Sequence, residues 1–348
     1  MRVLLVSAKT NQSLGGIAIW TERYLKACEQ QNISVELVNT CQIGKRAKQG
    51  NAKRSLVDEF FRTKKIFKEL REKERLGCYD IAHINSSCGK FGIIRDFLIV
   101  RSIKKHKIKT IVHFHCDIPF WINGRISKFF LGKIVKKVDQ ILVLCNNSQI
   151  FLKEQFSVSS VKIPNFVDEK MCKKEPHVIN PYINRVLFVG YIQPEKGIRE
   201  LFEVAERFSN IEFYLAGEMH DDIKKWDKGE NLHFLGRISQ SEVIKQMDEA
   251  DVFLFPTHSE GFSMSLAESM ARGLPIITTN VGANKDMIED RGGIVVEKGD
   301  VKAMIAAIMK LSDRNIRRNM SEWSKKKVIM EYTANKVIGL LYKIYNNC

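Results

Sequence analysis

The most constraining feature of the sequence is the stretch from Pro256 to Ile288, PTHSEGFSMSLAESMARGLPIITTNVGANKDMI. The apolar run Val252–Phe255 stops where it begins, and a run of that length bounded by turn residues is typical of a buried strand. A turn over 256–261, a helix from about Ser263 to Arg272 and a second strand over 276–279 are expected to follow. The turn would then lie at the carboxyl end of a strand and the amino end of a helix. Parallel sheets bind ligands there, and free N–H groups at a helix start attract anions.

The rest of the chain repeats this alternation of strand, turn and helix in two series of similar length. At 348 residues the chain is long enough for two ordinary domains, and the alternation is typical of parallel sheets covered by helices. The extended, proline-bounded stretch Pro164–Asp168 separates the two series and is interpreted as a linker. We therefore predict an α/β protein with two Rossmann-like parallel-sheet domains, over residues 1–165 and 169–331.

Composition limits the class of protein. No apolar run approaches the roughly 20 residues that a membrane-spanning helix needs. The amino-terminal MRVLLVSAKT is expected to form a first strand rather than a signal peptide. The eight cysteines are scattered and none forms a C-x-x-C pair, which favours reduced thiols in the cytoplasm and makes a metal site unexpected.

The net charge of +16 is concentrated in one half of the sequence. Residues 1–165 hold 30 Lys and Arg against 13 Asp and Glu, or +17, whereas residues 166–348 hold 26 against 27, or −1. An excess of this size fits a solvated surface. It also fits a polyanionic partner such as anionic lipid, nucleic acid or an acidic glycan.

Two basic stretches of the first half also carry apolar side chains. From Ser55 onward, apolar residues recur at roughly helical spacing and predict an amphipathic helix, following the strongly basic segment 44–54. Those residues are Leu56, Phe60, Ile66, Phe67 and Leu70. Between Phe120 and Lys137, aromatic residues are mixed with Lys and Arg. Both patterns fit contact with a membrane surface, and both also fit ordinary helices packed on a sheet.

Two carboxylates flank the turn that follows Phe255. Glu260 lies in the turn with Gly261 after it, so that the backbone there can approach a ligand closely. Glu268 lies in the following helix, but Ser265-Leu266-Ala267-Glu268 also fits a capping box, in which the glutamate only satisfies a backbone N–H. Glu268 therefore keeps a structural and a functional interpretation.

Three other turns carry candidate binding residues. Gly15-Gly16 lies between a strand and a helix, which suits a phosphate or sugar loop and equally a tight turn without a ligand. His113 and His115 share one face at the end of a strand, where His115 either hydrogen-bonds a substrate hydroxyl or is satisfied locally. Lys196, in the turn Gly190–Gly197, is either a point charge for a phosphate or an exposed turn lysine.

The motif S-E-G-F-S-x-S-L-A-E-S-M-A-x-G-L-P-I-I, with seven residues between Glu260 and Glu268, resembles the glutamate pair of retaining GT-B glycosyltransferases of family 4, the glycosyl transferases group 1. Further agreements run through nearly the whole chain: Gly15-Gly16, His115, the linker Pro164–Asp168 and the turn from Gly190 to Lys196-Gly197. The resemblance implies a GT-B fold, in which two Rossmann-like domains face a central cleft. It also implies that the last helix, at about 332–348, packs back on the first domain.

The resemblance implies a role for each matching residue. Lys196 would neutralise the diphosphate leaving group, Glu260 would contact the hydroxyls of the donor sugar, and His115 would contact the sugar from the first domain. These three are the expected catalytic residues, and Glu268 would hydrogen-bond the nucleotide ribose. The expected donor-binding set also includes Gly16, Gly190, Gly236, Arg237, Gly261, Phe262 and Ser263. The family needs no metal, so no metal or cofactor is expected.

One position departs from the family pattern. The family usually has Arg directly after the glycine of the phosphate-binding turn, whereas this chain has Tyr191 after Gly190. Either Arg237 or Lys285 reaches the diphosphate instead, or stabilisation of the leaving group is weaker by about 1.5–3 kcal/mol, the value of one charge-assisted hydrogen bond.

The resemblance therefore implies a retaining hexosyltransferase. The sugar would move from a UDP- or GDP-linked donor to a saccharide or polyprenyl-linked acceptor, in bacterial surface polysaccharide or lipopolysaccharide synthesis. The protein is expected to be cytoplasmic and peripheral on the anionic inner face of the membrane, through its basic first domain.

Two alternatives remain. The first is a catalytically weak or dead GT-B scaffold that binds anionic membrane or nucleic acid. The sequence shows no nucleic-acid-binding motif, so nucleic acid is not an expected partner. The second, more distant alternative is a sugar-nucleotide 2-epimerase of related architecture.

Overall fold

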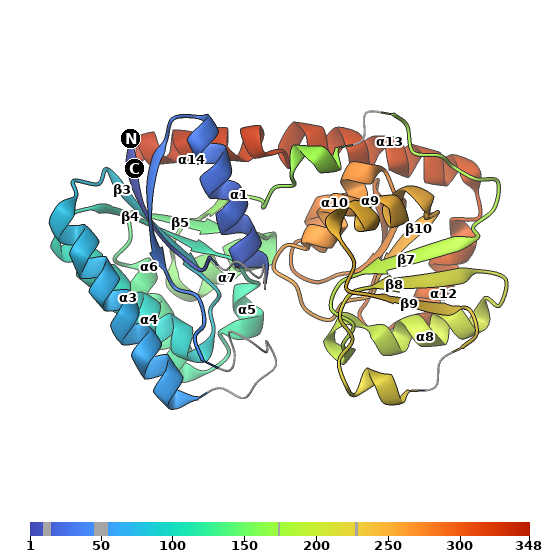
Figure 1. Cartoon of the computed structure of the whole chain (residues 1–348), viewed down its shortest axis with the longest axis horizontal. Helices are drawn as coiled ribbons and strands as arrows, with labels where there is room; N and C mark the ends of the chain where they lie inside the picture. Colours follow the sequence, from blue (N-terminus) through green and yellow to red (C-terminus); the bar gives the residue numbers. More distant parts are fainter. Residues whose placement is uncertain (10–14, 45–54, 173–174, 227–228) are drawn as a thin grey trace. The chain divides into compact units, whose positions relative to one another are not determined.

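The chain folds into two compact units (Figure 1). The structure is a computed structural model that describes residues 1–9, 15–44, 55–172, 175–226 and 229–348. Unit 1 comprises Met1–Asn165 together with Ala334–Cys348, and unit 2 comprises Phe166–Thr333. Each unit holds its own six-stranded sheet in which every strand pair is parallel, which confirms the predicted α/β class.

The sheet of unit 1 has the order β2-β1-β3-β4-β5-β6. Its strands are β1 (Arg2–Ser7), β2 (Ser34–Asn39), β3 (Ile81–Ser86), β4 (Lys109–Phe114), β5 (Gln140–Val143) and β6 (Val161–Lys162). Its helices are α1 (Gly16–Gln30), α3 (Leu56–Leu76), α4 (Lys90–Lys105), α5 (Ile118–Trp121), α6 (Arg125–Val135), α7 (Asn146–Phe156) and α14 (Ala334–Asn347).

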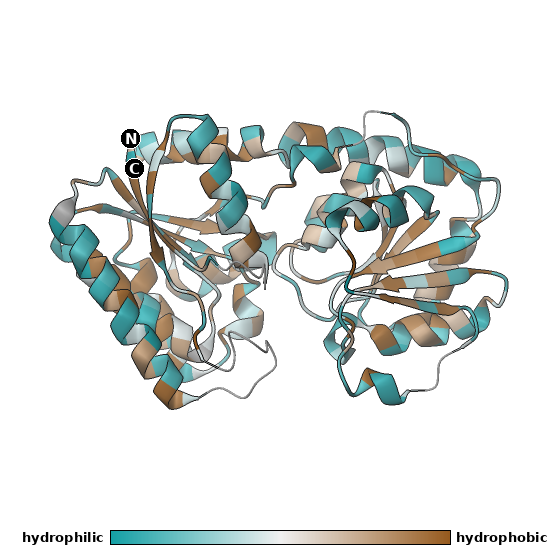
Figure 2. Cartoon of the chain, in the orientation of Figure 1, coloured by the Kyte–Doolittle hydropathy of each residue, from teal (hydrophilic) through white to brown (hydrophobic). Residues whose placement is uncertain are grey.

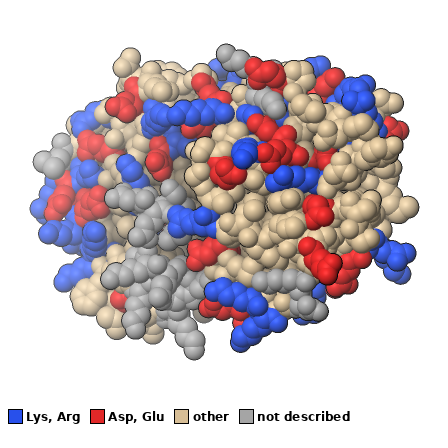
Figure 3. All heavy atoms as spheres, turned by 45° about the vertical axis from the view of Figure 1, so that its right-hand side comes forward, with Lys and Arg blue, Asp and Glu red and all other residues tan. Residues whose placement is uncertain are grey.

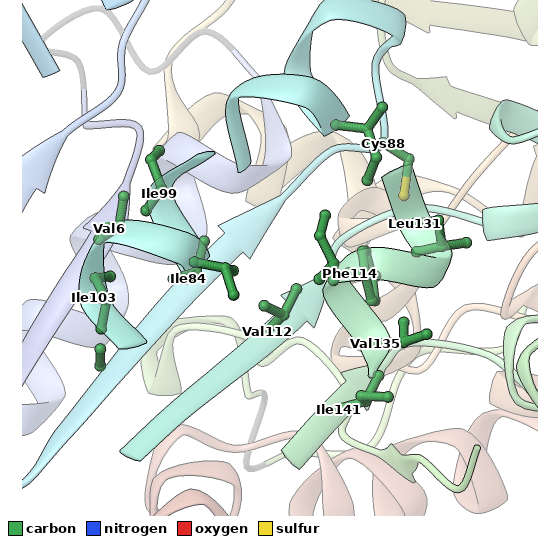
Figure 4. Close-up of a cluster of buried hydrophobic side chains, with 14 of the residues drawn as sticks. Val6, Ile84, Cys88, Ile99, Ile103, Val112, Phe114, Leu131, Val135 and Ile141 are labelled. Carbon is green, nitrogen blue, oxygen red and sulfur yellow. The ribbon is translucent and has the colours of Figure 1, made fainter. Parts of the chain in front are cut away.

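Alternation along the strands of unit 1 separates an aliphatic face from a face with aromatic and histidine side chains. Ile84 of β3 and Val112 of β4 pack with helices α3, α4 and α6 in a buried cluster (Figure 4). His83 and His113, which are next to Ile84 and Val112 in the sequence, point to the opposite face of the sheet. There the ring of His83 contacts the rings of His113 and of Tyr345 from α14. The two faces therefore differ in chemistry although the same strands supply both.

The sheet of unit 2 has the order β12-β11-β10-β7-β8-β9. Its strands are β7 (Arg185–Val189), β8 (Glu212–Ala216), β9 (Leu232–Gly236), β10 (Val252–Phe255), β11 (Ile276–Thr279) and β12 (Gly293–Val296). Its helices are α8 (Ile198–Arg207), α9 (Gln240–Glu249), α10 (Met264–Arg272), α11 (Asn284–Ile288), α12 (Val301–Lys310) and α13 (Arg314–Glu331), with short 3-10 turns at η1 (Glu169–Met171), η2 (Pro194–Lys196) and η3 (Ile223–Lys225). The strands are apolar along most of their length, whereas the helices also carry polar residues (Figure 2).

One helix start depends on a hydrogen bond between distant residues. Asn147 and Ser148 are of types that often cap helices, but α7 begins at Asn146 and Cys145 is its N-cap residue. Ser148 is buried instead, and its Oγ accepts a hydrogen bond from the N–H of Ile118 (2.9 Å). The hydroxyl thus fixes the start of α5, a long-range contact that the local sequence does not reveal.

Two findings concern the whole described chain. None of the helices that the described residues form is long and apolar enough to cross a bilayer. All eight cysteines are free thiols.

Candidate active site

The candidate site of unit 2 lies where the strand order reverses, between β7 and β10. Chain connections leave these neighbouring strands in opposite directions, so the loops at their carboxyl ends separate and leave room for a ligand. The loop after β7 runs from Gly190 to Gly197, and the loop after β10 runs from Pro256 to Ser263. These are the two turns in which the sequence predicted Lys196 and Glu260.

Backbone contacts hold the two loops together. Gly197 has a φ of 71°, and a Cβ at this position would collide with the carbonyl oxygen of Pro256. The N–H of His258 donates to the carbonyl of Glu195 (2.9 Å), and His258 Nε2 lies 2.8 Å from Glu200 Oε1 of α8. Neither Gly197 nor His258 was predicted as a site residue, although both lie within the predicted turns.

The side chains of Lys196 and Glu260 form an ion pair across these loops. Lys196 Nζ lies 2.5 Å from Glu260 Oε1, and the two side chains are 21% and 15% exposed. The same Nζ lies 5.8 Å from the centre of the Phe255 ring. A partly buried ammonium of this kind can bind a phosphate, and a partly buried carboxylate can accept hydrogen bonds from sugar hydroxyls.

A third loop supports the backbone beside Glu260. Gly282, after β11, has a φ of 54°, and a Cβ there would collide with the carbonyl oxygen of Glu260. The N–H of Ala283 donates to the carbonyl of Gly261 (2.9 Å). The turn at Gly282 is therefore in contact with the loop that carries Glu260.

The start of α10 corrects the interpretation of Glu268. Ser263 is the N-cap residue, and its Oγ accepts a hydrogen bond from the N–H of Leu266 (3.2 Å). Ser265 is therefore inside the helix, which rules out the capping-box interpretation of Ser265 and Glu268. Glu268 lies in the second turn of α10, half-buried. Phe262 is 7% exposed and packs edge-on against Tyr332, with 5.5 Å between ring centres.

Glycines follow β7 and β8, and another ends β9. Gly217 has a φ of 149°, and a Cβ there would overlap the carbonyl oxygen of Gly190. The N–H of Gly190 donates to Ala216 (2.9 Å), and the N–H of Gly217 donates to Gly236 (2.8 Å). Gly217 was missed as a site residue, although the repeated position of glycine at neighbouring strand ends is visible in the sequence.

The two cations suggested as substitutes for the missing arginine follow other strands of the sheet, Arg237 after β9 and Lys285 after β11. Arg237 is exposed and follows β9, which β8 separates from β7 in the sheet. Lys285 is exposed on α11. Tyr191, which occupies the usual arginine position, lies edge-on to His220 with 6.5 Å between ring centres.

The corresponding edge of unit 1 carries neutral polar groups. The strand order of unit 1 reverses between β1 and β3, which end at Ser7 and Ser86. Asn85 Nδ2 donates to Ser7 Oγ (2.8 Å), Ser7 Oγ lies 2.6 Å from Thr21 Oγ1, and His115 Nε2 lies 3.0 Å from Asn85 Oδ1. Only His115 of this hydrogen-bonded chain was predicted. The signal for the others was a polar residue at the end of a buried strand.

Gly16 is the first residue of α1 and is exposed. Gly15 before it has a φ of 97°, whereas a Cβ on Gly16 would meet no atom within 4 Å. The fold therefore requires a glycine at position 15 but leaves space for a side chain at position 16.

A cluster of buried aromatic rings surrounds His115. Its ring centre lies 4.0 Å from that of His113 and 5.0 Å from that of Trp20, and His83 lies 5.5 Å from His113. The prediction that His113 and His115 share one face is confirmed. Burial lowers the pKa of His83 and that of His115 from 6.5 to about 3, and it lowers the pKa of His113 well below its ordinary value. The three imidazoles are therefore neutral at pH 7.

No group of three or more His, Cys, Asp or Glu side chains within the described residues could hold a metal ion.

Comparison with solved structures defines the fold class as GT-B. The chain superposes on sucrose-phosphate synthase from Thermosynechococcus elongatus with a TM-score of 0.81 at 15% identity, covering 99% of this chain and 98% of the other. Anabaena HepE, solved in complex with UDP-glucose, gives a TM-score of 0.74 at 13% identity over the whole of both chains. At these identities the likeness shows the fold alone.

Sequence comparison then gives the family. Residues 172–327, which lie within unit 2, match the model of glycosyl transferases group 1. The capsular polysaccharide biosynthesis glycosyltransferase CapM of Staphylococcus aureus is 31% identical over 172 residues, which are 46% of this chain and 45% of CapM. Unit 2 therefore matches glycosyl transferases group 1, in agreement with the resemblance seen in the sequence.

Proposed function

We propose that the chain transfers a hexose from a UDP- or GDP-linked sugar to a saccharide or polyprenyl-linked acceptor, with retention of anomeric configuration. The observation that carries this proposal is the Lys196–Glu260 pair at the switch point of unit 2. The likeness to HepE, whose structure holds UDP-glucose, supports the choice of a nucleotide-sugar donor. The similarity to CapM supports a role in bacterial surface polysaccharide synthesis, of which lipopolysaccharide is one class.

Each side chain has a role in this proposal. Lys196 releases Glu260 and binds the diphosphate, while Glu260 accepts hydrogen bonds from hydroxyls of the donor sugar. Glu268 binds the nucleotide ribose, and backbone N–H groups at the start of α10, from Gly261 to Ser263, hold the sugar and diphosphate. Lys196 and this helix start supply positive charge where other enzymes use a metal ion, so we propose a metal-independent reaction without a cofactor.

The reaction needs stabilisation of the leaving group more than proton transfer. Glycosyl transfer passes through an oxocarbenium-like state while charge develops on the departing diphosphate. Lys196 is the cation placed to stabilise that charge, and we name no general base or covalent nucleophile. His115 stays neutral because of its low pKa, so its role is to hydrogen-bond the sugar while Asn85 fixes its ring.

The acceptor sets the proposed location. A polyprenyl-linked acceptor resides in the membrane, and the excess of Lys and Arg in residues 1–165 is suited to the anionic inner face of a cell membrane. We propose that the protein works in the cytoplasm as a peripheral protein at that face.

A nucleotide panel tests the proposal. The intact chain is heated with UDP, GDP and a set of their sugars, and we expect one base to raise the unfolding temperature. With the sugar that binds, release of the nucleoside diphosphate and the anomeric configuration of the product are then followed by NMR. If no nucleotide stabilises the chain and no diphosphate is released, the transferase proposal is wrong and the inactive scaffold is favoured. A sugar that changes configuration but stays on the nucleotide would indicate an epimerase.

A further inference from the structure

Unit 1 exposes large apolar side chains on helices whose opposite faces are buried. On α3, Leu56, Phe60 and Phe61 are 70%, 66% and 55% exposed. On α5 and α6, Phe120, Trp121 and Phe129 are 49%, 47% and 59% exposed. We call these six residues the docking face.

The docking face is separate from the residues that hold the helices on the sheet. Ile66 and Leu70 bury α3, and Leu131 and Ile134 bury α6. The sequence grouped Leu56 and Phe60 with Ile66 and Leu70 in one apolar stripe, but only the latter two pack into the core. Packing in the core therefore does not explain why the six exposed residues are apolar.

Topology places the docking face at one edge of the sheet. Each helix runs back against its parallel strand, so the amino ends of α3, α4 and α6 lie at the carboxyl edge. Arg95 Nη1 of α4 lies 3.9 Å from Glu59 Oε2 of α3, and the Phe97 and Phe130 rings of α4 and α6 are 5.5 Å apart. The three helices therefore lie side by side, as Figure 1 shows for α3 and α4.

Positive charges predominate around the docking face. Residues 118–137, which span α5 and α6, contain five Lys and Arg and no Asp or Glu. The ammonium of Lys133 lies 5.3 Å from the centre of the Phe129 ring. On α3, Lys64, Lys65 and Lys68 are exposed, whereas Asp58 and Glu59 are half-buried and Glu59 pairs with Arg62 at 3.2 Å.

Unit 2 provides the contrast. Its residues carry almost equal numbers of positive and negative charges, and Figure 3, which brings the right-hand side of Figure 1 forward, shows Asp and Glu mixed with Lys and Arg. Exposed apolar side chains occur there as well, for example Ile329 and Met330 at 52% and 61%, but next to acidic Glu331. The docking face differs from this region around α5 and α6, because no Asp or Glu lies between residues 118 and 137.

We propose that the docking face inserts its apolar and aromatic side chains into the interfacial region of an anionic lipid bilayer. Aromatic rings favour the depth of the headgroups, and lysines beside them reach the lipid phosphates. Stable attachment of a peripheral protein needs two signals, and this face supplies apolar insertion together with positive charge. This proposal rests on the proposed function in one respect. A polyprenyl-linked acceptor resides in the membrane, and it is the reason for the protein to bind there.

Vesicle binding by the intact chain tests the docking face. We expect the chain to bind vesicles of phosphatidylcholine and phosphatidylglycerol, to bind vesicles of phosphatidylcholine alone much more weakly, and to lose binding in high salt. Trp121 emission should shift to the blue on binding and be quenched by brominated lipid. The double variants Phe60→Ser/Phe61→Ser and Phe120→Ser/Trp121→Ser should each bind about tenfold more weakly or worse. The matched control Ile329→Ser/Met330→Ser, which removes equally exposed side chains from unit 2, should bind like the parent chain.

A nucleotide readout separates the docking face from the proposed function. Each variant should unfold at the parent temperature and keep any protection that the parent shows from a nucleotide. Equal vesicle binding by the docking-face and control variants would overturn the proposal, as would binding that ignores anionic lipid. Loss of a dimer in Phe60→Ser/Phe61→Ser would identify a second copy as the occupant and also overturn it. If the chain binds anionic vesicles through this face but no nucleotide stabilises it, the docking-face proposal is supported and the transferase proposal is wrong.

Discussion

The switch points of the two sheets have the same backbone plan and opposite chemistry. In unit 2, the loops after β7 and β10 bring together an ammonium and a carboxylate, Lys196 and Glu260. In unit 1, the residues at the switch point form a neutral chain, in which Asn85 links Ser7 to His115. The comparison teaches that a parallel sheet supplies only the position of a site. Whether that site suits an anion or a hydroxyl depends on a few side chains at the strand ends.

Solvent exposure explains why the switch point of unit 2 holds a charged pair, whereas that of unit 1 holds neutral histidines. Lys196 and Glu260 remain partly exposed, so both can stay charged while paired. His83 and His113 of unit 1 are buried, and a charged imidazole at either position would lose its hydration without gaining a carboxylate partner. Unit 1 is therefore expected to tolerate acid less well than unit 2.

The largest expected effect is the loss of unit 1 stability in acid. Protonation of His83 and His115 begins near pH 6.5 in the unfolded chain but only near pH 3 in the folded chain. The unfolded state therefore binds more protons between these values, and stability falls as pH falls through this window. Each unit of pKa shift corresponds to about 1.4 kcal/mol, so the histidine cluster should lower the unfolding free energy by several kcal/mol between neutral pH and about pH 3. Hydrogen exchange of the intact chain, followed by mass spectrometry against pH, should show unit 1 opening before unit 2.

A matched pair of variants tests the cause of that acid loss. His113→Phe keeps a ring against Trp20 but removes a titrating group, and it should reduce the pH dependence of unit 1. His233→Phe changes an exposed histidine beside Glu212 in unit 2 and should leave that dependence unchanged. Burial raises the pKa of Asp96, which opposes the acid loss because a raised carboxyl pKa favours the folded state as pH falls. Equal opening of both units at pH 5 would contradict the assignment to the histidines.

The next effect concerns the glycines at the strand ends of unit 2. Gly217→Ala adds a Cβ that overlaps the Gly190 carbonyl at a φ of 149°, and it should cost about 3 kcal/mol or more of unfolding free energy. Chemical denaturation measures this cost. Gly236→Ala is the matched control at the end of the neighbouring strand. Its φ of 65° is also strained, but its Cβ meets nothing within 4 Å, so the loss should be smaller. Equal losses would show that backbone strain, and not the collision, decides the effect.

The ion pair of unit 2 should matter more for activity than for stability. Lys196→Ala and Glu260→Ala should each lower turnover by about tenfold or more, because each removes a charge-assisted contact worth roughly 1.5–3 kcal/mol. Steady-state kinetics with the donor identified by the nucleotide panel measures the effect. Lys224→Ala removes the lysine of an exposed pair with Asp221 in the same unit and should change neither rate nor stability. Near-normal turnover in either site variant would remove that residue from the proposed site.

The sequence predicted the fold better than the details of the site. Central strands such as β10 are buried along their whole length and therefore appear as apolar runs, while glycines mark the turns after them. These signals are local, and they sufficed for two parallel sheets and for the loops that hold Lys196 and Glu260.

The contacts between loops could not be predicted because they join residues far apart in the sequence. The support of Glu260 by Gly282 and the hydrogen bond from Asn85 to Ser7 depend on strand order, which the local pattern does not contain. The capping-box interpretation of Glu268 could not be decided from the sequence for a different reason. Ser263 and Ser265 are both good caps, and only the backbone geometry at Ser263 selects between them.

The smallest expected effect tests whether the backbone of unit 1 takes part in donor binding. Gly16→Ala meets no atom within 4 Å and adds a better helix former at the start of α1, so stability should rise by up to about 1 kcal/mol. If the backbone at Gly16 approaches the donor phosphates, as we predict, the methyl group should also weaken nucleotide binding several-fold. Gly339→Ala, in α14 and equally free of neighbours, should stabilise the chain without changing nucleotide binding. Calorimetric titration of both variants decides the point, because unchanged affinity in Gly16→Ala would leave donor recognition to unit 2.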